Sequence, residues 1–167
     1  MRKLFLWLLV LFGVHCRGES FIDEEAYFPA LGQEGGFRLK EASYQELVVN
    51  FFAPHCPPCI EELPELRAFF KNATPHRGFL AIGSTLEALQ DPERGTLAHI
   101  SGEVENFVKE HNLNYPVYLA DHENLKSWNI RGFPETFVFM RERNNYILKR
   151  KFISAVKLNQ LEDYLSP

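Results

Sequence analysis

The stretch FFAPHCPPCIEELPEL (51–66) joins an apolar run to two cysteines that are separated by two prolines. The overlapping segment ELVVNFFA (46–53) is rich in β-branched and aromatic residues, which is typical of a strand buried on both faces. Proline is well tolerated in the first turn of a helix, and apolar residues from Ile60 onward recur at helical spacing. The sequence therefore predicts a buried strand, a turn that carries Cys56, and a helix that contains Cys59.

The two cysteines have three interpretations: a redox pair, half of a metal site, or a structural disulfide. Their spacing lets both sulfurs meet on the first helical turn, where free amides and the helix dipole favour a thiolate. A zinc site usually needs four ligands, and the chain has no second CxxC and no histidines at metal-ligand spacing. A disulfide that closes so small a loop would stabilise the fold little. Redox chemistry is therefore favoured, and no metal or cofactor is expected.

In a redox reaction the two sulfurs are expected to have different roles. Cys56 is the N-terminal thiol and is predicted to be the accessible one, so it should attack a partner disulfide. Cys59 lies one turn further into the helix and should resolve the mixed disulfide.

The chain of 167 residues is predicted to form one domain after an export signal. Residues 1–18 are interpreted as the signal, 19–44 as a loose N-terminal lead-in with one short hairpin, and 45–167 as the folded domain. Eighteen Lys and Arg against 22 Asp and Glu give a mild negative charge, which does not support nucleic-acid binding. The basic run LKRK (148–151) is interpreted as the solvated face of a strand.

The N-terminus has the pattern of a secretory signal peptide. Arg2 and Lys3 precede the uncharged run LFLWLLVLFGV (4–14), which is shorter than the roughly twenty residues of a membrane span. Export would place the protein in the periplasm or on the outer face of a bacterial membrane, where disulfides form. Cys16 follows this run and is similar to the lipidated cysteine of bacterial lipoproteins, but His15 stands where that signal prefers a small residue. Lipidation with N-terminal membrane anchoring and removal of Cys16 by cleavage both stay open.

Strands alternate with helices along the rest of the chain. Further strands are expected at 78–84, 115–120, 135–140 and 146–153. A tight turn at Asn144-Asn145 is expected between the last two. The expected helices are 101–113 with Ser101 as N-cap, 122–130, and a C-terminal helix capped by Ser154. This order indicates an α/β fold around a mixed sheet.

Two segments of the sequence resemble segments of a known protein family. VVNFFAPHCPPCIEELPEL (48–66) resembles the active-site segment of thioredoxin-fold proteins of the TlpA/ResA/CcmG type, and NIRGFPETFVF (129–139) resembles the segment that carries their cis-proline. The helix and strand at about 85–121 resemble an insertion that plain thioredoxins lack. Peroxiredoxins also have such an insertion, but their lone cysteine after a Thr-x-x pattern is absent here. The resemblance covers about 45–165 and implies a thioredoxin fold, a central mixed sheet flanked by helices, with an inserted helix–strand unit.

The resemblance also implies roles for single residues. Pro134 takes the position of the cis-proline opposite the cysteines, and the backbone of Phe133 would pair with a partner chain. His55 replaces a tryptophan of the family and would belong to the partner-binding surface. Glu62 matches an acidic residue that would relay protons during thiol exchange; the alternative is a surface glutamate of the first helical turn.

These expectations combine into an exported thiol–disulfide oxidoreductase. Pro57 and Pro58 remove two amides that could stabilise a Cys56 thiolate, and Glu61 and Glu62 add negative charge, so a reductant of protein disulfides is expected. A charged His55 would act in the opposite direction. The family suggests apocytochrome c or another exported client, and a membrane protein as electron donor. The alternative is a thioredoxin-fold metallochaperone, or another binding protein, that uses the same cysteines.

Overall fold

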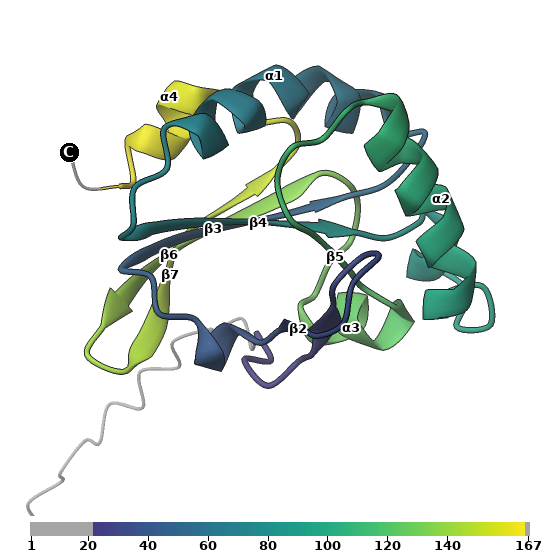
Figure 1. Ribbon diagram of the computed structural model, residues 1–167. Helices are drawn as coiled ribbons and strands as arrows, with labels where there is room; N and C mark the ends of the chain where they lie inside the picture. Colours follow the sequence, from purple (N-terminus) through teal and green to yellow (C-terminus); the bar gives the residue numbers. More distant parts are fainter. Residues whose placement is uncertain (1–21, 166–167) are drawn as a thin grey trace, which may run out of the picture.

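The computed structural model describes residues 22–165 and has a five-stranded mixed sheet at its centre (Figure 1). The strand order is β5-β4-β3-β6-β7. The first three strands run parallel, and β6 and β7 are antiparallel to their neighbours. The strands are β3 (Glu46–Phe52), β4 (Arg77–Gly83), β5 (Val117–Leu119), β6 (Glu135–Glu142) and β7 (Asn145–Ile153). The predicted strand at 46–53 is the central one, and every residue of β3 is buried, as expected from its sequence.

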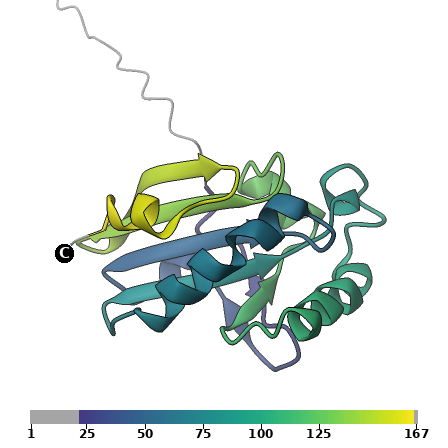
Figure 2. The ribbon, with the colours of Figure 1, turned by 90° about the horizontal axis from the view of Figure 1, so that it is seen from above.

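Helices cover both faces of the sheet, which confirms the predicted α/β class (Figures 1 and 2). One face carries α1 (Pro57–Lys71) and the short α4 (Leu158–Glu162). The other carries α3 (His122–Ser127), the 3-10 turn η1 (Leu39–Glu41) and a hairpin of β1 (Phe28–Pro29) with β2 (Gly36–Phe37). Between β4 and α3 lie the 3-10 turn η2 (Glu87–Leu89), α2 (Leu97–Glu110) and β5, so the expected extra helix and strand are present.

An aromatic cluster fills the core on the α3 face of the sheet. Phe28, Phe51, Trp128 and Phe137 are all at most 1% exposed, and their ring centroids lie 5.3–5.9 Å apart. Most of these pairs meet edge to face, a geometry that adds about 0.5–1.5 kcal/mol per pair beyond the burial of area. Because Phe28 comes from β1, the lead-in belongs to the core and is not loose.

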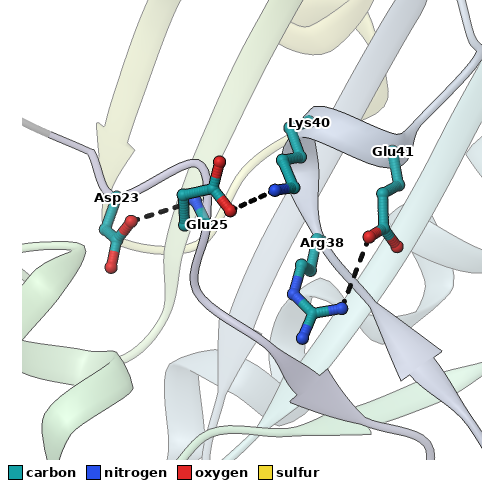
Figure 3. Close-up of polar contacts among 5 residues, drawn as sticks. All are labelled: Asp23, Glu25, Arg38, Lys40 and Glu41. Atoms are coloured by element: carbon teal, nitrogen blue, oxygen red, sulfur yellow. Dashed lines mark hydrogen bonds and ion pairs between the residues drawn. The ribbon is translucent and has the colours of Figure 1, made fainter.

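The lead-in is also tied to the sheet through its backbone. The Leu31 amide donates to the Val117 carbonyl at 2.9 Å, and Ala30 bridges Tyr118 on β5. On its outer side the polar contacts are solvent-exposed (Figure 3): Lys40 pairs with Glu25, and Arg38 with Glu41 at 3.3 Å. The Glu25 amide donates to the Asp23 carboxylate at 2.9 Å. Exposed ion pairs of this kind contribute about 0–1 kcal/mol, so apolar packing is the main anchor of this segment.

The helix expected at 101–113 begins earlier, so the prediction of Ser101 as its N-cap is wrong. The helix α2 starts at Leu97 after Thr96, because Leu97, Ile100 and Val104 continue the apolar helical period backwards. Ser101 lies inside the helix, and its hydroxyl donates to the Ala98 carbonyl at 3.4 Å.

Two further local predictions are corrected near the C-terminus. The β6–β7 turn is formed by Arg143 and Asn144, because Asn145 already pairs with Glu142; Arg143 has the positive φ of 58° that such a tight turn requires. Ser154 does not cap α4, whose N-cap is Lys157. The Ser154 amide instead donates to the Pro134 carbonyl at 3.1 Å.

Candidate active site

The two cysteines lie where β3 passes into α1, and they form a disulfide with a Cα–Cα distance of 5.2 Å. Cys56 is the N-cap of α1, and its Sγ accepts a hydrogen bond from the Cys59 amide at 3.3 Å. Pro57 and Pro58 occupy the first two helical positions and have no amide hydrogen, so the Cys59 amide is the first in the helix that can reach this sulfur. Cys56 is 4% exposed and Cys59 1%, so the exposed side chain expected at Cys56 is in fact nearly buried.

The loop before β6 reaches the same end of the sheet. The register pairs Phe51 with Glu135, which places Pro134 beside the end of β3, close to the start of the segment that carries Cys56. The Phe133–Pro134 peptide bond is cis, as the sequence predicts. Within residues 22–165, no hydrogen bond uses the backbone amide or carbonyl of Phe133. These two groups are therefore available for the pairing with another chain that is expected of Phe133.

Glu62 lies one turn after Cys59 and is buried, with 1% of its surface exposed. The alternative of a surface glutamate is therefore wrong. Its Oε1 accepts from Asn50 Nδ2 at 2.8 Å, and its Oε2 accepts from the Val156 amide at 3.0 Å. Burial raises the pKa of Glu62 from 4.5 to about 7, although both hydrogen bonds favour the charged form and act against this rise. A carboxyl with this pKa can both accept and release a proton near neutral pH.

Asn50 joins Glu62 to the strand that follows the cis-proline. Its Nδ2 donates to Thr136 Oγ1 at 2.9 Å as well as to Glu62, so both amide hydrogens are used. Sequence reasoning did not single out Asn50. The signal was present, because one asparagine within a strand that is otherwise apolar and buried needs a polar partner.

A second buried glutamate, Glu135, follows Pro134 directly and was also missed. It is fully buried, its Oε2 pairs with Lys151 Nζ at 2.6 Å, and its Oε1 accepts from the Arg131 amide at 3.0 Å. Lys151 also donates to the Asn129 carbonyl at 3.0 Å, so this ion pair holds the loop that leads to the cis-proline. The basic run 148–151 is therefore only partly a solvated face, because Lys151 turns inward.

His55 precedes Cys56 in the left-handed region, with φ 58°, and its side chain is exposed. It lines a hollow of about 230 Å³ between the start of α1 and α2. The resemblance predicts that His55 belongs to a partner-binding surface. The hollow that His55 lines is a concave surface at this position.

Between residues 22 and 165, no three His, Cys, Asp or Glu side chains converge as a metal site would require. Over the same range, none of the helices has the length and apolar character needed to cross a membrane. Cys16 and the predicted signal at 1–18 lie outside the described residues.

The sequence matches a known protein family over most of its length. Residues 22–151 match the profile of the AhpC/TSA family. Among curated proteins, the chain is 24% identical over 121 residues to sporulation thiol-disulfide oxidoreductase A of Bacillus subtilis, and 26% over 105 residues to thiol-disulfide oxidoreductase ResA of the same organism. These alignments cover 72% and 62% of this chain, but only 66% and 52% of the relatives, which is less than two thirds of each.

Solved structures confirm the fold. StoA from Bacillus subtilis superposes with a TM-score of 0.61 at 20% identity, over 84% of this chain and 96% of that one. A thioredoxin-related protein from Neisseria meningitidis gives a TM-score of 0.59 at 16% identity, over 82% and 94% of the two chains. A DsbF homologue from Corynebacterium diphtheriae gives 0.63 at 18% identity, over 89% and 87%. The predicted thioredoxin fold and the resemblance to ResA-type proteins are thus confirmed.

Proposed function

The chain belongs to the AhpC/TSA family, and we propose that it is an exported thiol–disulfide oxidoreductase that reduces protein disulfides through Cys56 and Cys59. The observation that carries this proposal is the disulfide between these cysteines at the N-terminus of α1, with the Cys59 amide directed at Cys56 Sγ. The activity in the names of the two Bacillus relatives supports it. Two cysteines one turn apart are suited to dithiol exchange, in which one sulfur attacks and the other resolves.

The reaction begins from the reduced pair. The Cys56 thiolate attacks one sulfur of the client disulfide, and the other client sulfur leaves as a thiolate. Cys59 then loses its proton and attacks Cys56 Sγ, which releases the second client sulfur and forms the Cys56–Cys59 disulfide. The client gains two electrons and the pair loses two, so a separate protein reductant must regenerate the dithiol.

Glu62 is proposed to accept the proton of Cys59. It follows Cys59 by one helical turn, is buried, and has a pKa of about 7, close to the pH at which a general base is most effective. When it is ionised, its charge would also oppose a thiolate nearby and so favour oxidation of the pair. Pro134 and Phe133 are proposed to hold the client chain against the cysteines.

Transport and partners complete the proposal. The N-terminal sequence supports export to the periplasm or to the outer face of a bacterial membrane, with Cys16 as an alternative anchoring point. The client would be an exported protein with a disulfide, with apocytochrome c as one candidate, and the electron donor would be a membrane protein. The expected reducing direction is supported by the paired prolines, which leave few amides near Cys56.

Trapping with cysteine variants tests the proposal. Cys59→Ser should accumulate mixed disulfides with a protein substrate such as insulin, because Cys56 can attack but nothing resolves the product. Cys56→Ser should trap none, and the wild-type protein should turn insulin over with a chemical reductant. Equal trapping by both variants would overturn the assigned roles, and no reduction of insulin or of small disulfides by the wild type would overturn the function.

The proton relay is tested with Glu62→Gln, which keeps the shape and removes the charge. Because the base is lost, resolution of a preformed mixed disulfide should slow by roughly a hundredfold near neutral pH. The Cys56 pKa should fall, because a negative charge has been removed. Rapid-quench kinetics and thiolate absorbance against pH measure these two effects. Glu61→Gln, an exposed neighbour on the same turn, is the matched control and should change neither strongly.

A further inference from the structure

The hollow beside the redox pair has an apolar base and an acidic rim. Ile60 from α1, 40% exposed, and Phe107 from α2 provide apolar surface in a space of about 230 Å³. Glu103 and Glu110, seven residues apart on one face of α2, also line it, from the same helix as Phe107. His55 and His111 also line this hollow. A cavity of this shape can accept one long side chain.

The two carboxylates of the rim lack a cationic partner. Within residues 22–165, neither Glu103 nor Glu110 forms an ion pair or a side-chain hydrogen bond, although both lie on a helix with a lysine. That lysine, Lys109, pairs with Glu105 at 2.6 Å. Arg94 lines an adjoining hollow together with Glu103 but pairs with Asp91 at 3.6 Å. The hollow therefore presents negative charge that a ligand can neutralise.

The position of the hollow links it to the reaction. His55 directly precedes Cys56 and Ile60 directly follows Cys59, so two residues that line the hollow are chain neighbours of the cysteines. A client joined to Cys56 through a mixed disulfide would have the residues next to its own cysteine within reach of the hollow.

We propose that this hollow binds a lysine or arginine side chain that lies next to the reactive cysteine of the client. The inference rests on the proposed disulfide exchange and adds a substrate preference to it. The aliphatic stem of such a side chain would lie on Ile60 and Phe107, and its cationic head would lie between Glu103 and Glu110. An acidic client side chain would meet two like charges at the same place.

Three disulfide-linked peptides test the preference. They differ only in the residues that flank the cysteine: lysine, norleucine or glutamate. The rate constant for their reduction by the dithiol form is measured by acid quench at about pH 8. We expect the lysine peptide to react about tenfold faster than the glutamate peptide at low salt, with norleucine between them. The difference should shrink in about 0.5 M salt, because salt screens exposed charges.

Matched charge variants locate the effect. Glu103→Gln/Glu110→Gln should reduce the lysine-to-glutamate rate ratio to about twofold, and the ratio is taken within one variant so that general damage cancels. Glu41→Gln/Glu142→Gln removes the same charge at the opposite end of the sheet and should keep the ratio. Equal rates for the three peptides, or a ratio that survives the first variant, would overturn the inference and leave the proposed function intact. Failure to reduce any peptide would instead overturn the function, and the inference with it.

Discussion

Two buried glutamates lie at the active-site end of the sheet, on opposite faces, and are stabilised differently. Glu62 from α1 faces Asn50, and its carboxylate accepts from the Asn50 side-chain amide and from the Val156 backbone amide. Glu135 belongs to the adjacent row of β6, so its side chain points to the other face, where Lys151 pairs with it at 2.6 Å. Both glutamates are at most 1% exposed. The difference lies in their partners, because one has neutral donors and the other has a cation.

This difference separates two uses of a buried carboxyl. A buried charge without a counter-ion is costly, so Glu62 takes up a proton at a pH where an exposed glutamate is ionised. A buried charge with a counter-ion holds structure, and Glu135 with Lys151 fixes the loop before the cis-proline. The face with Glu62 is therefore suited to proton transfer, and the face with Glu135 to positioning.

The largest effect is expected when the ion pair is broken. Lys151→Met leaves the Glu135 charge buried without its cation, which should lower the free energy of unfolding by about 3–4 kcal/mol. Urea denaturation measures this loss. Lys149→Met, which breaks the exposed pair with Glu142, should cost about 0–1 kcal/mol. Similar losses in both variants would mean that Glu135 does not depend on its cation.

A smaller effect is expected in the pH dependence of stability. Below about pH 4.5 Glu62 is protonated in both the folded and the unfolded state. Between about 4.5 and 7 the folded protein keeps a proton that the unfolded chain releases, so the free energy of unfolding falls by up to about 3 kcal/mol as pH rises. Above about 7 this contribution stays constant. Denaturation across this range should show a fall in the wild type that exceeds the fall in Glu62→Gln by this amount, and parallel curves would contradict it.

The smallest effect is expected from the donor to Glu62. Asn50→Leu keeps the branching at Cγ but removes the hydrogen bond to the carboxylate. The ionisation constant of Glu62 should therefore fall roughly tenfold, so that its pKa rises further above about 7. NMR titration of the Glu62 carboxyl carbon measures this change. Thr136→Val removes the other partner of Asn50 and is the matched control, with a smaller shift expected. If Asn50→Leu leaves the titration unchanged, the amide does not stabilise the charge.

Most of the fold could be predicted because its signals are local. The apolar run of β3, the prolines at the start of α1 and the alternating elements that follow determine the class and the position of the cysteine pair. The errors occurred at helix starts and turns. Ser101 and Ser154 are both residue types that often cap helices. Ser101 lies inside α2 because the apolar pattern of that helix begins at Leu97. Ser154 lies outside α4, and its amide donates to the Pro134 carbonyl.

The site was predicted only where a motif marks it. The cysteines and Pro134 belong to short patterns, so their positions follow from the sequence. The burial of Glu62, the pairing of Glu135 with Lys151, and the acidic rim on α2 depend on segments that are distant in the chain. Residue type favoured a solvated surface for Glu135 and Lys151, and tertiary contacts overrode that preference. For Glu62, the surface position was only the alternative to the role that the resemblance implies.

The two outer strands of the sheet also bear on aggregation. β5 is only three residues long and is bridged by Ala30 from the lead-in, while β7 carries the exposed cations Lys149 and Arg150 and a register shift opposite Val138/Phe139. Short, covered or charged edges discourage another chain from adding a strand. In the proposed reaction, the protein would hold polypeptides that are losing their own structure. Because the two outer strands are short, covered or charged, a client chain would leave as a monomer and would not add a strand to this sheet.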